Sequence, residues 1–123
     1  MKSDLIVFSY RQEVKRTIEK IVRDMDITFL YIDRWDELAQ LINKDKGTLI
    51  LIDSNVHKRH GFSIYKNIRS LSPKSKVVLI NTPTKKEGTV KEAMNAGAYG
   101  CLDWPLIRWE ASTLIEYLLR DME

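Results

Sequence analysis

Short apolar runs alternate along the chain with segments in which apolar residues recur every three or four positions. The runs are rich in Val, Ile, Leu and Phe and lack polar alternation, which is typical of strands covered on both faces. They predict strands at 5–8, 27–32, 48–52, 77–80 and 99–102. The helical spacing between them predicts five helices, at 14–25, 35–42, 64–71, 86–95 and 107–122. The pattern therefore indicates an α/β protein.

The strict alternation predicts a single doubly wound domain over residues 1–123, with a five-stranded parallel sheet in the order 2-1-3-4-5 and right-handed crossovers. In such a sheet the functional crevice lies beyond the carboxyl ends of the strands, where the strand order reverses. The crevice residues that follow the strands are Ser9, Tyr10, Asp53, Thr82, Trp104 and Pro105. Because the turn after the first strand holds no glycine, a phosphate-cradling nucleotide site is not expected.

Composition narrows the class of protein. The net charge of +3 is a mild excess and the charged residues are mixed in sign, so direct nucleic-acid binding is not expected. The single cysteine, Cys101, excludes an internal disulfide and suits a reducing compartment. No apolar run approaches the roughly 20 residues that a membrane helix needs, and the first residues do not have signal-peptide form. We expect a cytoplasmic protein without membrane contact.

Several motifs together resemble the receiver domain of two-component response regulators. They are the strand 49–53 that ends in Asp53 with Gly61 eight residues later, the strand 77–82 that ends in Thr82, the run 92–100, and Pro105. The resemblance covers nearly the whole chain. It implies a flavodoxin-like receiver fold, a role in signal transduction or a phosphorelay, and Asp53 at the phosphoacceptor position.

The departures from the family pattern concern its metal and phosphoryl site. The family has an acidic pair after the first strand, where this chain has Ser9 and Tyr10, and a lysine before the late proline, where this chain has Trp104. Mg²⁺ prefers several carboxylate oxygens, and Asp53 offers one carboxylate where the family uses three acids. Mg²⁺ binding is expected to be weak or absent, no other cofactor or metal is implied, and Tyr10 and Trp104 are expected to fill the metal pocket.

Single residues of the crevice allow two interpretations each. Asp53 is a phosphoacceptor or a remnant carboxylate bonded by nearby amides or Thr82, and we favour the remnant. Cys101 stands where the family has its switch aromatic; a packed apolar role is favoured over a redox role. His57 and His60 are assigned to a solvated loop rather than to a metal site.

Because an aromatic residue before proline favours the cis form, we predict a cis Trp104–Pro105 bond with Trp104 covering the crevice.

The function that these features favour is an atypical receiver, or pseudo-receiver, that acts in signal transduction or transcription regulation through phosphorylation-independent protein contact or dimerisation. The resemblance implies a partner face on the fourth helix, fifth strand and fifth helix. Its residues are Lys91, Met94, Asn95, Tyr99, Cys101 and Trp109. The partner is another protein, a second copy of the chain, or an output domain fused outside this sequence.

Two alternatives remain open. A small-ligand sensor would use an aromatic-lined crevice between Tyr10, Asp53, Thr82 and Trp104, and a receiver still weakly phosphorylated on Asp53 would retain part of the family chemistry. An enzyme is not expected, because the sequence offers no pairing of a nucleophile with a base. The signal, the partner and the oligomeric state lie beyond what the sequence determines.

Overall fold

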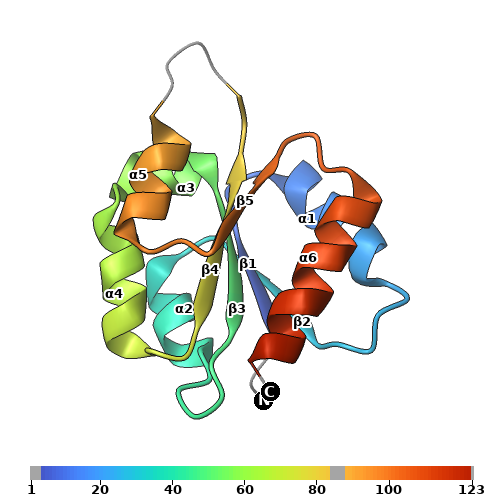
Figure 1. The fold of residues 1–123 in the computed structure, drawn as a ribbon, viewed down its shortest axis with the longest axis horizontal. Helices are drawn as coiled ribbons and strands as arrows, with labels where there is room; N and C mark the ends of the chain where they lie inside the picture. The colour runs from blue at the N-terminus through green and yellow to red at the C-terminus, as the bar shows by residue number, and fades with distance from the viewer. Residues whose placement is uncertain (1–3, 84–87, 123) are drawn as a thin grey trace.

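The computed structural model describes residues 4–83 and 88–122 and shows one parallel five-stranded sheet in the order 2-1-3-4-5 (Figure 1). Its strands are β1 Leu5–Phe8, β2 Phe29–Ile32, β3 Leu49–Asp53, β4 Lys76–Asn81 and β5 Gly100–Asp103. Each neighbouring pair is parallel, with Phe8 beside Ile32 on one side and beside Ile52 on the other. The predicted doubly wound α/β fold with this strand order is confirmed.

Six helices flank the sheet in the described part of the chain, one more than the sequence predicts. They are α1 Gln12–Val22, α2 Trp35–Leu41, α3 Ser54–His60, α4 Ser63–Leu71, α5 Thr89–Ala96 and α6 Arg108–Asp121. The start expected for the fourth helix, at 86, lies outside the described residues. None of the described helices is long and apolar enough to cross a bilayer.

The additional helix, α3, occupies the segment that was assigned to a loop, so that prediction is wrong. His57 is buried, and its ring nitrogens are hydrogen-bonded to the Tyr65 hydroxyl (2.8 Å) and the Glu92 carboxylate (3.2 Å). These contacts tie α3 to α4 and α5. The inward side of this helix therefore includes a hydrogen-bonded polar side chain, which an apolar pattern does not reveal.

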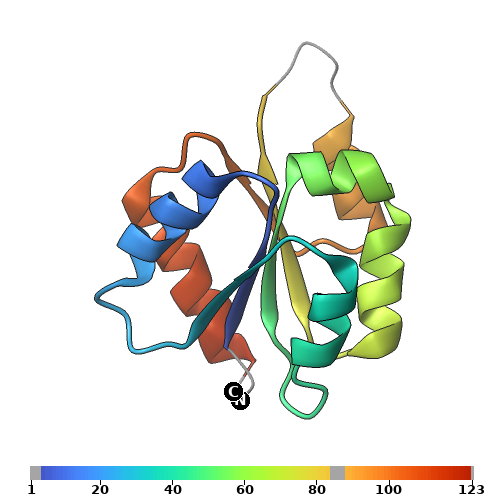
Figure 2. The same ribbon diagram turned by 180° about the vertical axis from the view of Figure 1, so that it is seen from behind.

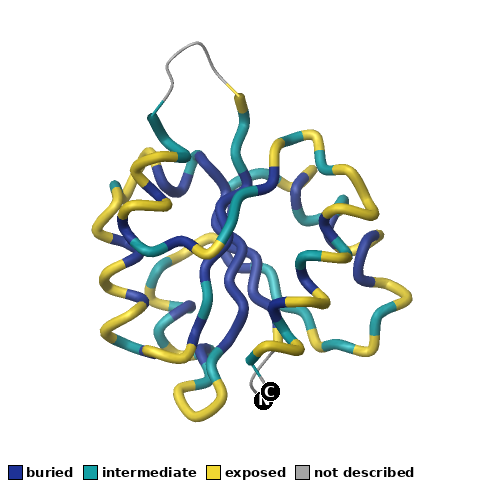
Figure 3. The backbone as a smooth tube through the Cα atoms, in the orientation of Figure 1, coloured by how far each residue is buried: buried dark blue, intermediate teal, exposed yellow. Residues whose placement is uncertain are grey.

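The two faces of the sheet bury separate apolar clusters. Helices α1 and α6 cover one face and α2, α3, α4 and α5 cover the other (Figures 1 and 2). Alternate strand residues supply the two clusters, so that Val7 faces α1 and α6 while Phe8 faces the other layer. Figure 3 shows the central strands as the most deeply buried part of the chain.

The turn before β3 brings two backbones into close contact. Asn43 organises this turn, because its side-chain oxygen accepts hydrogen bonds from the Asp45 and Lys46 amides. Gly47 then takes a φ of +85°, and a Cβ atom there would lie 2.4 Å from the Lys74 carbonyl oxygen. Only glycine fits this backbone crossing without displacement.

Candidate functional site

Asp53 is the centre of the crevice at the carboxyl ends of the strands. It is the last residue of β3, and its side chain is fully buried. The Ser9 hydroxyl, at the end of β1, donates a 2.6 Å hydrogen bond to Asp53 Oδ2. The same Ser9 oxygen accepts the Arg11 amide at 3.0 Å, and the Tyr31 hydroxyl donates to the Ser9 carbonyl at 2.8 Å. These bonds fix the loop between β1 and α1 directly above the carboxylate.

Arg11 binds both oxygens of this carboxylate. Its Nε donates to Asp53 Oδ2 and its Nη2 donates to Oδ1, each at 2.8 Å. Nη2 also donates to the Thr82 hydroxyl at 3.1 Å, which links the loop after β1 to the end of β4. This two-pronged contact is the geometry in which a guanidinium pairs most strongly with a carboxylate. The charge of Asp53 is therefore neutralised from within the chain.

Trp104 covers the guanidinium from the β5 side. The Arg11 Cζ atom lies 5.0 Å from the centre of the Trp104 ring, within the range of a cation–π contact. Glu13, in α1, adds a weaker ion pair with Arg11 Nη1 at 3.5 Å. The hydrogen bonds to Asp53 raise the pKa of Arg11, and the nearby charges of Asp53 and Glu13 add to this effect, which outweighs the opposing effect of partial burial. The predicted cis Trp104–Pro105 bond is present.

Tyr10 does not take the position expected of it. Its hydroxyl is hydrogen-bonded to His60 Nε2 at 3.0 Å, and its ring meets Phe8 edge-on on the face covered by α2 to α5. Trp104 packs against the other face, the one covered by α1 and α6. Partial burial, with Arg59 nearby, lowers the pKa of His60. The expectation that Tyr10 and Trp104 together fill the metal pocket is wrong, because Arg11 occupies the space beside Asp53 instead.

Arg11 is the crevice residue that the sequence-based prediction omitted. That prediction included the first two residues after β1, Ser9 and Tyr10, whereas Arg11 is the third. The sequence does contain an indication of this role. A buried carboxylate without a metal ion needs a counter-charge, and Arg11 is the cationic residue nearest in sequence to the crevice residues. Within the described residues, no group of three or more His, Cys, Asp and Glu side chains is arranged to hold a metal ion.

The residues named for the partner face come from α5, from the segment just before β5 and β5 itself, and from α6. Lys91, Met94 and Asn95 are exposed on α5, and Tyr99 is exposed just before β5. Trp109, in the first turn of α6, keeps 69% of its surface exposed. Asp103 is exposed and accepts a hydrogen bond from the Asn81 side chain at 3.2 Å. An aromatic surface therefore exists on this side of the molecule.

Cys101 is half-buried on this surface, and burial together with the Asp103 charge raises its pKa to about 11. Relative to the ordinary value of 9.0, the thiolate population near neutral pH falls by about a hundredfold, and the thiolate is the reactive form. We predict that Ellman's reagent modifies Cys101 about a hundred times more slowly in the folded protein than in urea. The rate should rise with pH throughout the range below 11; a plateau near pH 8 would contradict the assignment.

Comparison with known families places the chain in one of them. The family model for the response regulator receiver domain matches residues 9–116. The match includes Ser9, Arg11, Asp53, Thr82 and Trp104, and so spans the whole crevice. The chain belongs to the response regulator receiver domain family. No curated protein matches its sequence.

Solved structures show the same fold at low sequence identity. A response regulator from Thermotoga maritima has a TM-score of 0.81 at 12% identity, covering 98% of this chain and 99% of that one. A CheY-like protein, TadZ, from Pseudomonas aeruginosa has a TM-score of 0.75 at 18% identity, covering 93% and 97%. NtrX from Brucella abortus, in complex with ADP, has a TM-score of 0.81 at 20% identity and covers 99% of this chain. This chain spans 27% of that NtrX chain.

Proposed function

We propose that this receiver domain signals by protein contact, without phosphorylation of Asp53. The observation that carries the proposal is the two-pronged Arg11–Asp53 pair beneath Trp104. A phosphoacceptor carboxylate must direct one oxygen at the incoming phosphorus atom. Both oxygens of Asp53 instead accept hydrogen bonds, and the side chain is fully buried. Phosphorylation would first have to displace Arg11.

The side chains around Asp53 also do not fit Mg²⁺. Asp53 is contacted by the hydroxyl of Ser9 and the guanidinium of Arg11, and the Thr82 hydroxyl and the exposed Glu13 carboxylate are joined to it only through Arg11. Mg²⁺ prefers an octahedron of oxygen ligands that includes carboxylates, and a cation 2.8 Å from the carboxylate competes for the same charge. We therefore propose that Arg11 takes the electrostatic role that a metal ion has in a phosphorylated receiver. No catalytic step is assigned to the domain.

The contact surface in this proposal is the aromatic side of α5, β5 and α6. Met94, Tyr99, Trp109 and Tyr117 are large, exposed side chains, and tyrosine and tryptophan are the residues that most often anchor protein interfaces. The partner is another protein, a second copy, or an output domain joined to this one. The hydrogen bonds and ion pairs that the structure gives Arg11 and Asp53 involve Ser9, Glu13 and Thr82 rather than these four side chains, which stay exposed.

Two other functions receive less support. A ligand sensor requires open space between Tyr10 and Trp104, but these residues pack on opposite faces of the sheet and Arg11 lies against Asp53. A weakly phosphorylated receiver gains some support from Arg11 itself, because a guanidinium is also a good phosphate ligand. Only the second alternative predicts a response to phosphoryl mimics.

The deciding experiment adds Mg²⁺ and then beryllofluoride, a phosphoryl mimic, to the protein while tryptophan fluorescence is followed. We expect no saturable change, because Trp104 lies over an arginine that already neutralises Asp53. Incubation with acetyl phosphate should likewise leave the intact mass unchanged. The matched control is Asp53→Asn, which should behave like the native protein in both assays.

A saturable fluorescence change that disappears in Asp53→Asn would overturn the proposal in favour of the weakly phosphorylated receiver. The mass measurement tests the same point independently, since it detects a phosphoryl group on Asp53 directly. In the Arg11→Ala variant the guanidinium no longer competes for Asp53, and a response to Mg²⁺ in this variant alone would support the proposal that Arg11 excludes the metal ion.

A further inference from the structure

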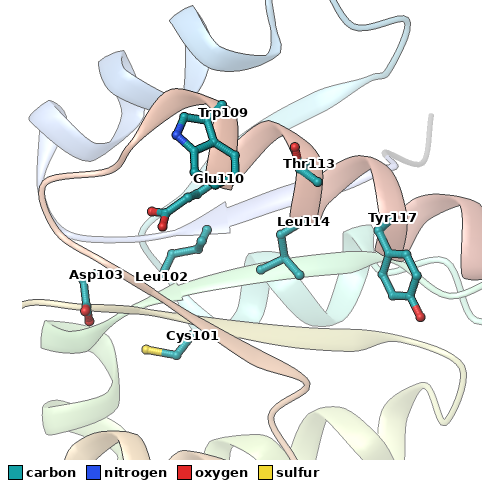
Figure 4. Close-up of a pocket in the computed structure, with 8 residues that line it drawn as sticks. All are labelled: Cys101, Leu102, Asp103, Trp109, Glu110, Thr113, Leu114 and Tyr117. Carbon is teal, nitrogen blue, oxygen red and sulfur yellow. The ribbon is translucent and has the colours of Figure 1, made fainter.

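A pocket between β5 and α6 lies on the contact surface and has a mixed apolar and acidic lining. Its volume is about 430 Å³. Figure 4 shows the Trp109 and Tyr117 rings toward its two ends with Leu114 between them. Cys101 and Asp103 line it from β5, and Glu110 lines it from the first turn of α6. The pocket therefore combines aromatic walls, an apolar floor and two carboxylates.

The charge of the pocket is negative and is not neutralised by the described residues. Asp103 and Glu110 are both exposed, and neither forms an ion pair with another residue among 4–83 and 88–122. Arg108, the nearest cation in sequence, reaches back to Asp24 at 3.2 Å. The thiol of Cys101 contributes no charge at neutral pH, since burial raises its pKa further above neutrality, to about 11. In a chain of net charge +3, this is a local acidic site.

We propose that this pocket receives an arginine side chain from a partner protein. The inference rests on the proposed function, since it assigns the partner's chemistry on the same contact surface. An arginine matches the lining in each part: its aliphatic stem lies on Leu114, its planar guanidinium stacks on the exposed face of Trp109, and its N–H groups bond the carboxylates. Asp103 already accepts a hydrogen bond from the neutral Asn81 side chain, but a purely apolar ligand would leave both acids without a counter-charge, and an anion would be repelled by them.

The arginine belongs to a segment of another protein rather than to a second copy. A second copy bound through the same surface would bring its own Asp103 and Glu110 against this acidic pocket, and like charges repel. An arginine anchored between an aromatic ring and carboxylates is also among the contacts that contribute most to protein interfaces.

The experiment titrates the whole chain with N-acetyl-arginine methylamide and follows amide and indole N–H signals by NMR. The three tryptophans, Trp35, Trp104 and Trp109, are assigned by substitution with phenylalanine. We expect saturable shifts at the Trp109 indole and at the amides of 101–103 and 109–117. The citrulline analogue has nearly the same shape without the charge, and it should bind at least about tenfold more weakly.

Matched variants identify the carboxylates. Glu110→Gln and Asp103→Asn should each lower the affinity for the arginine probe about fivefold. Glu116→Gln is the control, because Glu116 lies on the same helix but lines a separate pocket facing the end of α1. It should leave the affinity unchanged.

Four results would overturn the inference. Three come from the titration: equal binding of the citrulline analogue, shifts centred away from Trp109, or no saturable shift at all. The fourth is a doubled mass in light scattering that Trp109→Ala returns to the monomer, which would assign the pocket to a second copy. A negative result with the arginine probe can be distinguished from a failure of the proposed function. The beryllofluoride response depends on Asp53, whereas the arginine probe reports only on the pocket at β5 and α6.

Discussion

Replacing Arg11 with methionine is expected to lower the free energy of unfolding by about 3 kcal/mol, because it leaves a fully buried carboxylate without its counter-charge. Methionine keeps much of the apolar stem, so packing under Trp104 changes little. Ser9 still donates one hydrogen bond to Asp53, which limits the loss. Urea unfolding at neutral pH, followed by tryptophan fluorescence, measures the difference.

The control is the same substitution at an exposed pair. Arg34 lies 2.9 Å from Asp36, nearly the distance of the buried pair, but both side chains are more than half exposed. Arg34→Met should change stability by less than about 0.5 kcal/mol. Asp53→Asn in the Arg11→Met background should recover part of the loss, since the buried charge is then absent. Equal effects at Arg11 and Arg34 would contradict the role given to the buried pair.

Gly47→Ala is expected to cost about 4 kcal/mol or more of stability, because the new Cβ would collide with the backbone of the segment that leads into β4. The Lys74 carbonyl oxygen would lie 2.4 Å away and the Ser75 nitrogen 2.9 Å away. Neither atom can move without displacing the connection between α4 and β4. The midpoint of urea unfolding should fall accordingly.

The Gly61→Ala variant distinguishes the stability lost through steric collision from the stability lost through backbone strain. Gly61 also has a positive φ, of +75°, but a Cβ there would meet nothing within 4 Å. Its substitution should cost about 1–2 kcal/mol from conformational strain alone. If the two alanine variants lose the same stability, the close approach at Gly47 is not what destabilises that variant.

Much of the fold could be predicted from the sequence, because strands buried on both faces produce uninterrupted apolar runs. β1, β3 and β4 appear within one or two residues of their expected bounds. The helix α3 could not be found in this way. Its inward side combines Val56 with the polar side chains of Ser54 and His57, so no apolar stripe marks it. Its stability depends on the partners Tyr65 and Glu92, which are distant in sequence.

The candidate site was predictable in position but not in chemistry. The rule that ligands bind at the carboxyl ends of parallel strands led directly to Ser9, Asp53 and Thr82, which the structure joins through one hydrogen-bond network. Arg11 was not predicted because it directly precedes α1, and its long side chain reaches back from there to Asp53 at the end of β3. The opposite orientations of Tyr10 and Trp104 depend on the path of each loop, which residue types alone do not determine.

The guanidinium beside Asp53 is covalently part of the chain, so its presence beside the carboxylate does not depend on binding from solution. A diffusible ion occupies a site according to its concentration and can be removed by a chelator, whereas Arg11 is present in every folded copy at a fixed one-to-one ratio. Its local concentration is set by the loop after β1 and is independent of the surrounding solution. In this structure the positive charge beside Asp53 is therefore intramolecular, and its amount does not depend on the ionic composition of the solution.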